Sequence, residues 1–381
     1  MNASASDHGL ALPALNGANP LGFLAALGTL VVIRKSGNPD ARLSWRQQTN
    51  WVPVIDRLVV RDAQKLAEAI ASLLRGHEIT AQADTDRESS QRQFDRARKA
   101  MKDKLAEIKK RKLKGTARAA AFSAEVLPLE GAMKERRSDW LIALKKAVPS
   151  EELALGKHID CTPAEFCDHA SAFISGASNA SRFSMDLLAA FGSDAVTDKY
   201  GRIGSTPFCF ITGSGHQYFL DTVRLLIEQV SAERVHQALF APWEYRDEKL
   251  SMRWDPAEDR RYALMDRDPT ASDNKSRTVW MANLLAYRSL VLFPSAATSG
   301  QLETTGWTQT EAGPAFTWPI WEEPLRPEVI QSLLQLDGLK AEKLNHVQLR
   351  ERGIVAAFRS RRIQVGNPPL HKINFTPAQG L

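Results

Sequence analysis

The stretch NPLGFLAALGTLVVIRKSG, residues 19–37, decides the fold because it carries helix signals at both ends of an apolar segment. Asn19 is a favoured N-cap residue, Pro20 suits the first helical position, and Gly37 can end the helix. Apolar side chains occur nearly all round this helix, which we place at residues 19–36. A helix of that kind is buried on most of its faces.

Two further features of this helix bear on its surroundings. Gly22 and Gly28 allow the backbone of a neighbouring element to approach closely. The apolar run from Leu21 to Ile33 is about thirteen residues long, whereas a membrane span needs about 20. We therefore expect a core helix and no membrane partner.

Short strands and further helices are expected outward from this point. The expected strands are RLSW (42–45), WVPVI (51–55), TPFCFIT (206–212) and residues 354–365. The expected helices cover residues 61–74, 139–147, 164–174, 216–230, 231–239, 277–292 and 327–336. The stretch FTWPIW (316–321) contains a proline, which predicts an edge strand or an extended loop.

The order of these elements shows no regular βαβ alternation, so we predict an α+β fold. A glycine- and serine-rich stretch, ISGASNASRFS, indicates a boundary near residue 175. We expect two closely packed regions, 1–175 and 176–381. The first would hold the buried helix and a basic helical insertion at about 76–131.

The composition is that of an ordinary globular protein, with 43% hydrophobic and 25% charged residues among 381. The first residues, MNASASDHGLALPALNG, lack the pattern of a secretory signal. Three cysteines suit a reducing compartment better than a disulfide framework. Together these features favour a soluble, cytoplasmic protein.

Positive charge is concentrated between Arg92 and Arg118, a stretch that contains twelve basic residues and only three acidic ones. The chain as a whole carries only +6. Phe94, Met101 and Ile108 recur at helical spacing, so one narrow apolar stripe would leave the other faces basic. Such a surface binds phosphate backbones with steep salt dependence and little sequence preference. The alternative is a solvated helical insertion that keeps the protein soluble.

A second basic cluster lies near the C-terminus, in RERGIVAAFRSRRIQVG (350–366). The expected strand here would present arginine, whose planar fork suits phosphate recognition, on one face. The alternative is an edge strand protected from aggregation by charge. The residues that we predict to contact nucleic acid are Arg92, Arg96, Arg98, Lys99, Lys102, Lys109, Lys110, Arg111, Lys112, Arg359, Arg361 and Arg362.

Motifs of catalysis are absent from the sequence: no phosphate-binding loop, no nucleophile elbow and no paired metal-binding histidines occur. We therefore predict no catalytic residue, no metal and no cofactor. The densest polar motif, SMRWDPAEDRRYAL (251–264), brings Asp255, Glu258 and Asp259 together, with Asp266 and Asp268 following. These acids could bind magnesium for nuclease chemistry, but nearby arginines favour a turn locked by salt bridges.

The chain resembles proteins of type I-G (formerly I-U) CRISPR loci, in their accessory or large-subunit-like family, which includes forms fused as an extension of the helicase-nuclease. The resemblance rests on the stretches LPALNGANPLGFLAALGTL, RLSW, SMRWDPAEDRRYAL, ANLLAYRSLVLFP, TTGW, FTWPIW and GIVAAFRSRRIQVG. It implies a subunit of an RNA-guided complex, in which the guide reads sequence and proteins hold backbones. The basic segment 92–118 lies outside the resemblance.

Our hypothesis is a non-catalytic subunit of a type I-G antiviral interference complex that contacts guide RNA or target DNA. Its expected partners are crRNA, target DNA, other effector subunits and the helicase-nuclease. The alternatives are a metal-dependent nuclease centred on the acidic cluster at 255–268, and a scaffold that contacts protein only.

Overall fold

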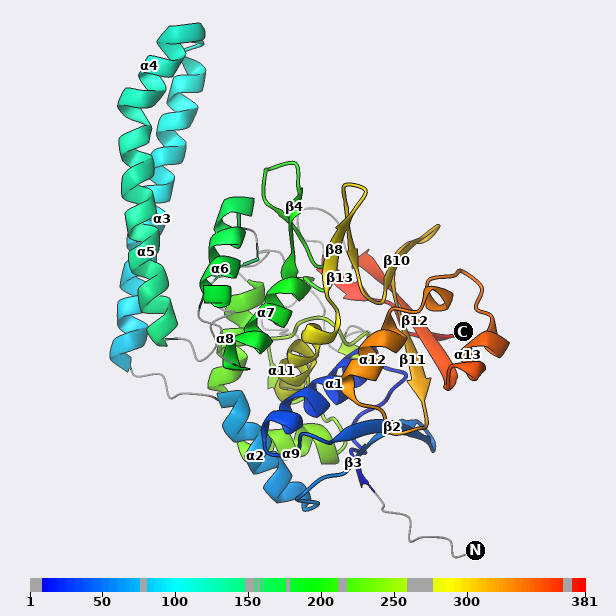
Figure 1. Ribbon diagram of the computed structural model, residues 1–381. Helices are drawn as coiled ribbons and strands as arrows, with labels where there is room; N and C mark the ends of the chain where they lie inside the picture. The colour runs from blue at the N-terminus through cyan, green and yellow to red at the C-terminus, as the bar shows by residue number, and fades with distance from the viewer. Residues whose placement is uncertain are drawn as a thin grey trace, which may run out of the picture. The chain divides into compact units, whose positions relative to one another are not determined.

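The computed structural model describes residues 9–75, 81–147, 155, 158–159, 161–175, 179–211, 218–258, 277–365 and 372–381. They form a mixed α+β fold with several small sheets, as predicted (Figure 1). No helix within these ranges is both long enough and apolar enough to cross a membrane.

The chain divides into two compact units. Residues Met1–Arg75 and Lys157–Leu381 form what we call the main unit, and Gly76–Gly156 form the inserted unit. The boundaries therefore lie at 75/76 and 156/157 rather than near 175. The reason is that helices from the first and last thirds of the chain pack on one another within the main unit.

The main unit contains most of the secondary structure. Its helices are α1 (Pro20–Lys35), α2 (Ala63–Arg75), α6 (Pro163–Ser175), α7 (Asn179–Phe191), α8 (Phe219–Glu228), α9 (Ala232–Phe240), α11 (Trp280–Arg288), α12 (Pro327–Leu334) and α13 (His346–Glu351), with the 3-10 helices η3 (Ser289–Leu292) and η4 (Asp337–Leu339). Its strands are β1 (Leu10–Ala11), β2 (Arg42–Gln47), β3 (Trp51–Asp56), β4 (Gly192–Thr197), β5 (Ile203–Ser205), β6 (Asp247–Glu248), β7 (Arg277–Thr278), β8 (Ser295–Thr298), β9 (Gln301–Thr304), β10 (Trp307–Thr310), β11 (Gly313–Trp321), β12 (Ile354–Val365), β13 (Lys372–Phe375) and β14 (Gln379–Gly380).

Helix α1 begins and ends where the sequence predicted. The Asn19 side chain accepts a hydrogen bond from the Gly22 amide at 3.1 Å, and Pro20 occupies the first turn. The helix is buried from Pro20 to Ile33 and packs against α11. A Cβ atom on Gly28 would lie 1.7 Å from the carbonyl oxygen of Leu285, so only glycine permits this helix contact.

Two sheets share the core with these helices. One has the order β1-β3-β2, and the other has the order β10-β11-β12-β13, with β14 also pairing with β12. The indole N–H of Trp318 donates to the Gly17 carbonyl at 2.8 Å, and that of Trp321 donates to the Leu43 carbonyl at 2.8 Å. Phe23 of α1 contacts both of these rings. The ends of the main unit are therefore joined through one aromatic core.

The prediction that residues 316–321 form an edge strand or a loop was wrong. They belong to β11, which lies between β10 and β12. The Thr317 amide donates to the Gly306 carbonyl on the β10 side, so the nitrogen of Pro319, two residues on, faces the same side. Proline has no backbone N–H to donate. Because β10 pairs with β11 only as far as Phe316, no hydrogen bond between these strands is lost at Pro319.

The prediction of a strand at 206–212 was also wrong. The structure describes this stretch as far as Ile211, and it contains no strand there. The chain turns instead, and the Cys209 amide donates to the Thr206 carbonyl at 3.0 Å. This turn places the fully buried Phe208 against Trp254, Phe293 and other rings. The apolar character of the stretch therefore reflects burial and not strand formation.

The inserted unit is a helical hairpin. It consists of α3 (Ala81–Lys110), α4 (Gly115–Glu125) and α5 (Leu127–Ala147), with α3 packed against both of the others. Phe94 of α3 stacks on Trp140 of α5, with 5.3 Å between ring centroids. Ile108 is also buried. The helix expected at 139–147 is the last part of α5, so the helical insertion extends past residue 131.

Candidate functional site

The basic residues predicted on the insertion lie on the exposed faces of α3 and in the turn that follows it. Phe94 and Ile108 belong to the buried stripe that faces α5. With 3.6 residues per turn, Arg92, Arg96 and Lys99 lie along the opposite side of the helix. Their side chains, together with those of Arg98, Lys102, Lys109, Lys110, Arg111 and Lys112, are exposed.

Some of these charges are neutralised within the hairpin. Arg111 donates to Glu125 at 2.7 Å and also to Glu107, which accepts from Lys104 at 2.7 Å as well. Hydrogen bonds from Lys104 and Arg111 lower the pKa of Glu107, and the bond to Glu125 is the main cause that raises the pKa of Arg111. This network ties the end of α3 to α4. Arg111 is therefore a structural residue of the hairpin.

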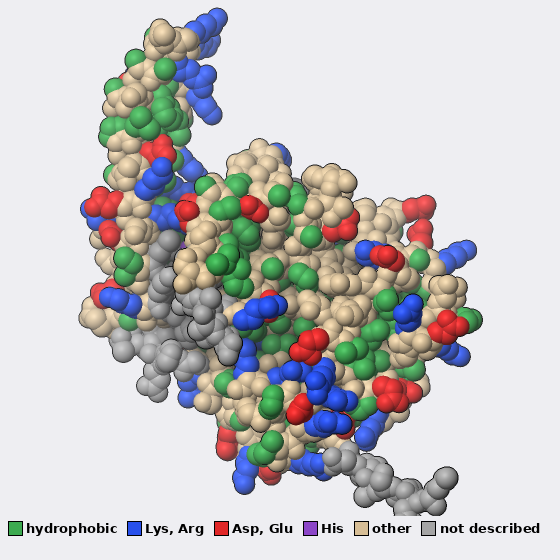
Figure 2. All heavy atoms as spheres, in the orientation of Figure 1, with side chains coloured by type: hydrophobic (Ala, Val, Ile, Leu, Met, Phe, Trp, Pro, Cys, Tyr) green, Lys and Arg blue, Asp and Glu red, His purple; other side chains and the backbone are tan. Residues whose placement is uncertain are grey.

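Most of the remaining cations have no such partner. Arg92 forms an ion pair with Glu88 at 3.4 Å. Seven others form no ion pair with any residue in the described ranges. They are Arg96, Arg98, Lys99, Lys102, Lys109, Lys110 and Lys112, and we call them the open cations. Figure 2 shows basic side chains along the hairpin and at the end where α3 turns into α4.

The turn between α3 and α4 brings further positive charge to this end. Lys112 adopts a left-handed backbone conformation with φ of 51°, and Gly115 follows with φ of 54°. Lys114 and Arg118 are exposed on either side of the first turn of α4. The unpaired backbone N–H groups of that turn add partial positive charge. The surface is thus positive over the second half of α3 and the start of α4.

The arginines of the C-terminal cluster lie in a different setting. Arg359 is only 9% exposed, and its guanidinium donates to Thr317 Oγ1 at 2.8 Å. The same group donates to the carbonyl oxygens of Leu339, Ala341 and Glu342. The chain around η4 covers this face of β12, so the Arg359 side chain is buried beneath it. Its donors are already used, and Arg359 fixes the loop around η4.

Arg361 and Arg362 are both half-buried, and Arg362 is held by contacts within the fold. The guanidinium of Arg362 lies 5.4 Å from the centre of the Phe210 ring and donates to the Cys209 carbonyl at 3.4 Å. Burial lowers the pKa of Arg362. Arg350 and Arg352, at the end of α13, are exposed. The structure therefore does not join the C-terminal arginines into one surface.

The acidic motif at 255–268 is described only in its first part. Asp255 accepts from Asn19 Nδ2 at 2.8 Å and from the Tyr245 hydroxyl at 2.7 Å. Asp259, Asp266 and Asp268 lie outside the described residues, so the nuclease hypothesis remains a prediction. Among the residues that are described, no three His, Cys, Asp or Glu side chains are placed to hold a metal ion.

Sequence reasoning missed the buried polar cluster that Glu258 forms beside Asp255. Glu258 accepts from the hydroxyls of Ser251 and Thr278, the first at 2.5 Å. Burial, reinforced by the charge of Asp255, raises the pKa of Glu258 to about 8. The cluster links the N-terminus of α1 to the start of α11 through side chains that the sequence separates widely.

Comparison with known proteins leaves the chain without an assigned relative: no family model matches it, and no curated protein matches it significantly.

Proposed function

We propose that this protein binds the phosphate backbone of a nucleic acid through the open cations of the inserted unit, without reading sequence. The observation that carries the proposal is the set of seven exposed cations, six on α3 and Lys112 in the turn that follows it, that no described acid neutralises. Ion-paired surface cations release few counterions on binding, whereas open ones release many, which drives association.

The dimensions of α3 suit this role. The helix rises about 1.5 Å per residue, so the distance from Arg92 to Lys110 is about 27 Å. Duplex DNA presents phosphates every 3.4 Å or so along each strand, so this length matches roughly eight nucleotide steps. Between Arg92 and Lys112 the polar face carries no aromatic side chain on which a base could stack, since Phe94 is buried. Backbone contact is therefore the mode that this surface supports.

We propose further, on the resemblance to type I-G CRISPR proteins, that the chain acts as a non-catalytic subunit of an RNA-guided interference complex in the cytoplasm. Its partners would be crRNA or target DNA, the other effector subunits and the helicase-nuclease. In such a complex, base pairing supplies sequence specificity and protein subunits hold backbones. A positively charged surface suits that division of labour.

The experiment is fluorescence anisotropy with labelled duplex DNA, single-stranded DNA and single-stranded RNA over a salt series. The test variant replaces four open cations with glutamine, which keeps helix propensity. They are Arg96, Lys99, Lys102 and Lys110. The matched control replaces the same number of basic residues on α5. They are Lys134, Arg136, Arg137 and Lys146.

With seven contacts, log K should fall against log salt with a slope of about −6 on duplex DNA. Affinity would then drop about 4,000-fold between 50 and 200 mM salt. The test variant should show a slope of about −3 and a drop of about 60-fold. The control variant has the same net charge and should keep the wild-type slope. Equal slopes for the two variants would refute a local site, and no binding by the wild-type chain would refute the proposal altogether.

Membership of the complex has a separate test. Expressed with the products of a type I-G locus, a tagged chain should co-purify with crRNA and effector subunits at physiological salt. Elution as a monomer free of RNA and of the other subunits would refute this part of the proposal and leave backbone binding standing.

A further inference from the structure

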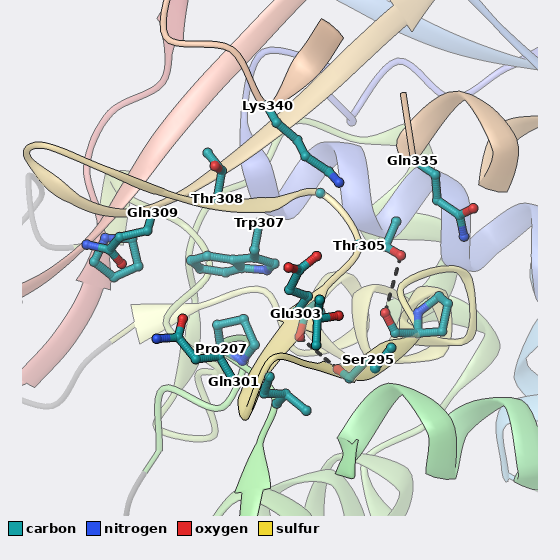
Figure 3. A pocket seen from close by; sticks show the side chains of 17 residues that line it. Pro207, Ser295, Gln301, Glu303, Thr305, Trp307, Thr308, Gln309, Gln335 and Lys340 are labelled. Carbon is teal, nitrogen blue, oxygen red and sulfur yellow. Dashed lines mark hydrogen bonds between the residues drawn. The ribbon is translucent and has the colours of Figure 1, made fainter. Parts of the chain in front are cut away.

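The β8–β9 hairpin and strand β10 border a hollow in the main unit that the proposed function does not use. Its volume is about 650 Å³ (Figure 3). Trp307, Thr308 and Gln309, three successive residues of β10, all line it, although side chains alternate between the two faces of a strand. In Figure 3 the side chains of Trp307 and Thr308 lie on opposite sides of β10. The hollow therefore runs along the edge of β10 and not over one of its faces.

A second strand edge borders the same hollow. Residues 301–304 of β9 line it in the same successive way, and β9 pairs only with β8 among the described strands. β10 is the first strand of the order β10-β11-β12-β13, so β11 is its only described partner. Thr305 and Gly306 join β9 to β10, but the two strands form no ladder with each other. The hollow thus lies between two strand edges that no described strand covers.

Hydrogen bonding to β11 leaves alternate backbone groups of β10 free. The Thr317 amide donates to the Gly306 carbonyl at 2.8 Å, which marks these two residues as a hydrogen-bonded pair. Bonded and non-bonded pairs alternate along an antiparallel ladder, so Trp307 and Gln309 occupy non-bonded positions. Their N–H and C=O groups point away from β11 and form no backbone hydrogen bond with any described residue. Trp307 is buried, whereas Gln309 is exposed, so Gln309 is the accessible position.

The sequence of β10 carries none of the usual devices that block a free edge. Natural edge strands are commonly protected by lysine, proline, a bulge or a covering element. β10 is WTQT (307–310), pairs with β11 without a register shift, and borders a hollow where a covering element would lie. An open edge of this kind is complementary to the main chain of an extended polypeptide, which presents donors and acceptors at the same spacing. Because β9 borders the far side, the hollow suits one extended chain rather than the two-stranded hairpin of a second copy.

We propose that the outer edge of β10 binds an extended segment of a partner protein as an added strand, through the backbone N–H and C=O groups of Gln309. The segment in contact would match the four residues of β10, a length of about 14 Å. Recognition through main-chain groups excludes proline from the position that bonds to Gln309 and leaves the other residues of the segment open. The inference goes beyond the proposed function and does not depend on nucleic-acid binding.

The probe is a phage-displayed library of random peptides of about twelve residues, selected on the full-length protein. The most enriched peptide would be synthesised with a fluorescent label and measured by anisotropy. Gln309→Pro removes the outward N–H, and proline is tolerated where the N–H of an edge strand faces solvent. This variant should bind the peptide about fivefold or more weakly than the wild type. Gln309→Thr keeps the N–H and should bind within about twofold of the wild type.

A matched proline control lies on the outer edge of β8. Ala297 is exposed, does not line the hollow, and occupies a non-bonded position opposite Leu302, because the Thr305 amide donates to the Pro294 carbonyl two pairs away from a like position. Ala297→Pro therefore removes an outward N–H elsewhere and should leave peptide affinity within about twofold.

Changes in the peptide test the same contact without altering the protein, so the test does not depend on the folding of Gln309→Pro. N-methylation of the peptide amide that bonds to Gln309 should weaken binding about fivefold or more, and N-methylation of the adjacent amides should not. No enriched peptide, equal weakening by the two proline variants, or an N-methyl scan without such a position would overturn the proposal. Dimerisation of the wild type that Gln309→Pro abolishes would assign the edge to a second copy and overturn it as well.

Discussion

Glu258 should make the stability of the main unit fall as the pH rises from about 4.5 to about 8. Its carboxyl is 6% exposed, and burial beside Asp255 raises its pKa from 4.5 to about 8. The folded state then holds a proton that the unfolded state has lost across this window. Stability is fully present below pH 4.5 and decreases toward pH 8.

The size of this effect follows from the shift. Each pH unit inside the window costs about 1.4 kcal/mol for one proton, so at pH 7 the loss is on the order of 3 kcal/mol. Glu258→Gln removes the titration. Like a protonated carboxyl, the glutamine amide can donate to one of the Ser251 and Thr278 hydroxyls and accept from the other. The variant should therefore match the wild-type stability near pH 4.5 and exceed it by a few kcal/mol at pH 8.

The assay is urea unfolding at several pH values from 4.5 to 8, followed by tryptophan fluorescence. The signal reports mainly the main unit, because only Trp140 of the nine tryptophans lies in the inserted unit. Glu311→Gln, at an exposed position, controls for a change of net charge. A difference in unfolding free energy between wild type and Glu258→Gln that stays constant with pH would refute a protonated, buried Glu258.

Three other predictions concern the packing described above. Gly28→Ala should lower the stability of the main unit by about 3 kcal/mol or more, measured as a reduced urea midpoint, because the added Cβ overlaps the Leu285 carbonyl. Arg359→Met should cost about 2 kcal/mol in the same assay by leaving internal acceptors unpaired, and should leave the salt slope of nucleic-acid binding unchanged. Phe94→Ala removes the ring stacked on Trp140 and should lower the stability of the hairpin by about 3 kcal/mol, seen as a lower unfolding temperature in the ellipticity at 222 nm.

Local signals in the sequence predicted individual elements well. The cap at Asn19 and the close-approach role of Gly28 follow from rules that act within a turn or at a single position, and both are confirmed. Pro319 and Phe208 were placed wrongly because their setting depends on distant segments. The proline is tolerated where it is because β10 ends beside it, and Phe208 is buried by rings far along the chain.

In the candidate site too, features set by local sequence could be predicted, and features set by distant segments could not. Exposure of the open cations could be predicted, because α3 has a single apolar stripe and its remaining faces are left to solvent. The burial of Arg359 could not be predicted. Side chains alternate between the two faces of the sheet along β12, but this alternation does not tell which face another element covers. Glu258 was singled out with the acidic motif, but its partners Ser251 and Thr278 could not be predicted, because they surround a segment whose ends meet only in the folded chain.

The contact between α1 and the C-terminal sheet has a consequence for the order in which the protein acquires its structure during translation. The Trp318 indole that bonds to Gly17 is 301 residues away along the chain. At about 5–20 residues per second, a ribosome delivers Trp318 roughly 15–60 s after Gly17. The helix α1 must therefore remain without its C-terminal neighbours for that time, although β2 and α2 can already pack against it. The hairpin of the inserted unit, whose contacts are local, can form meanwhile.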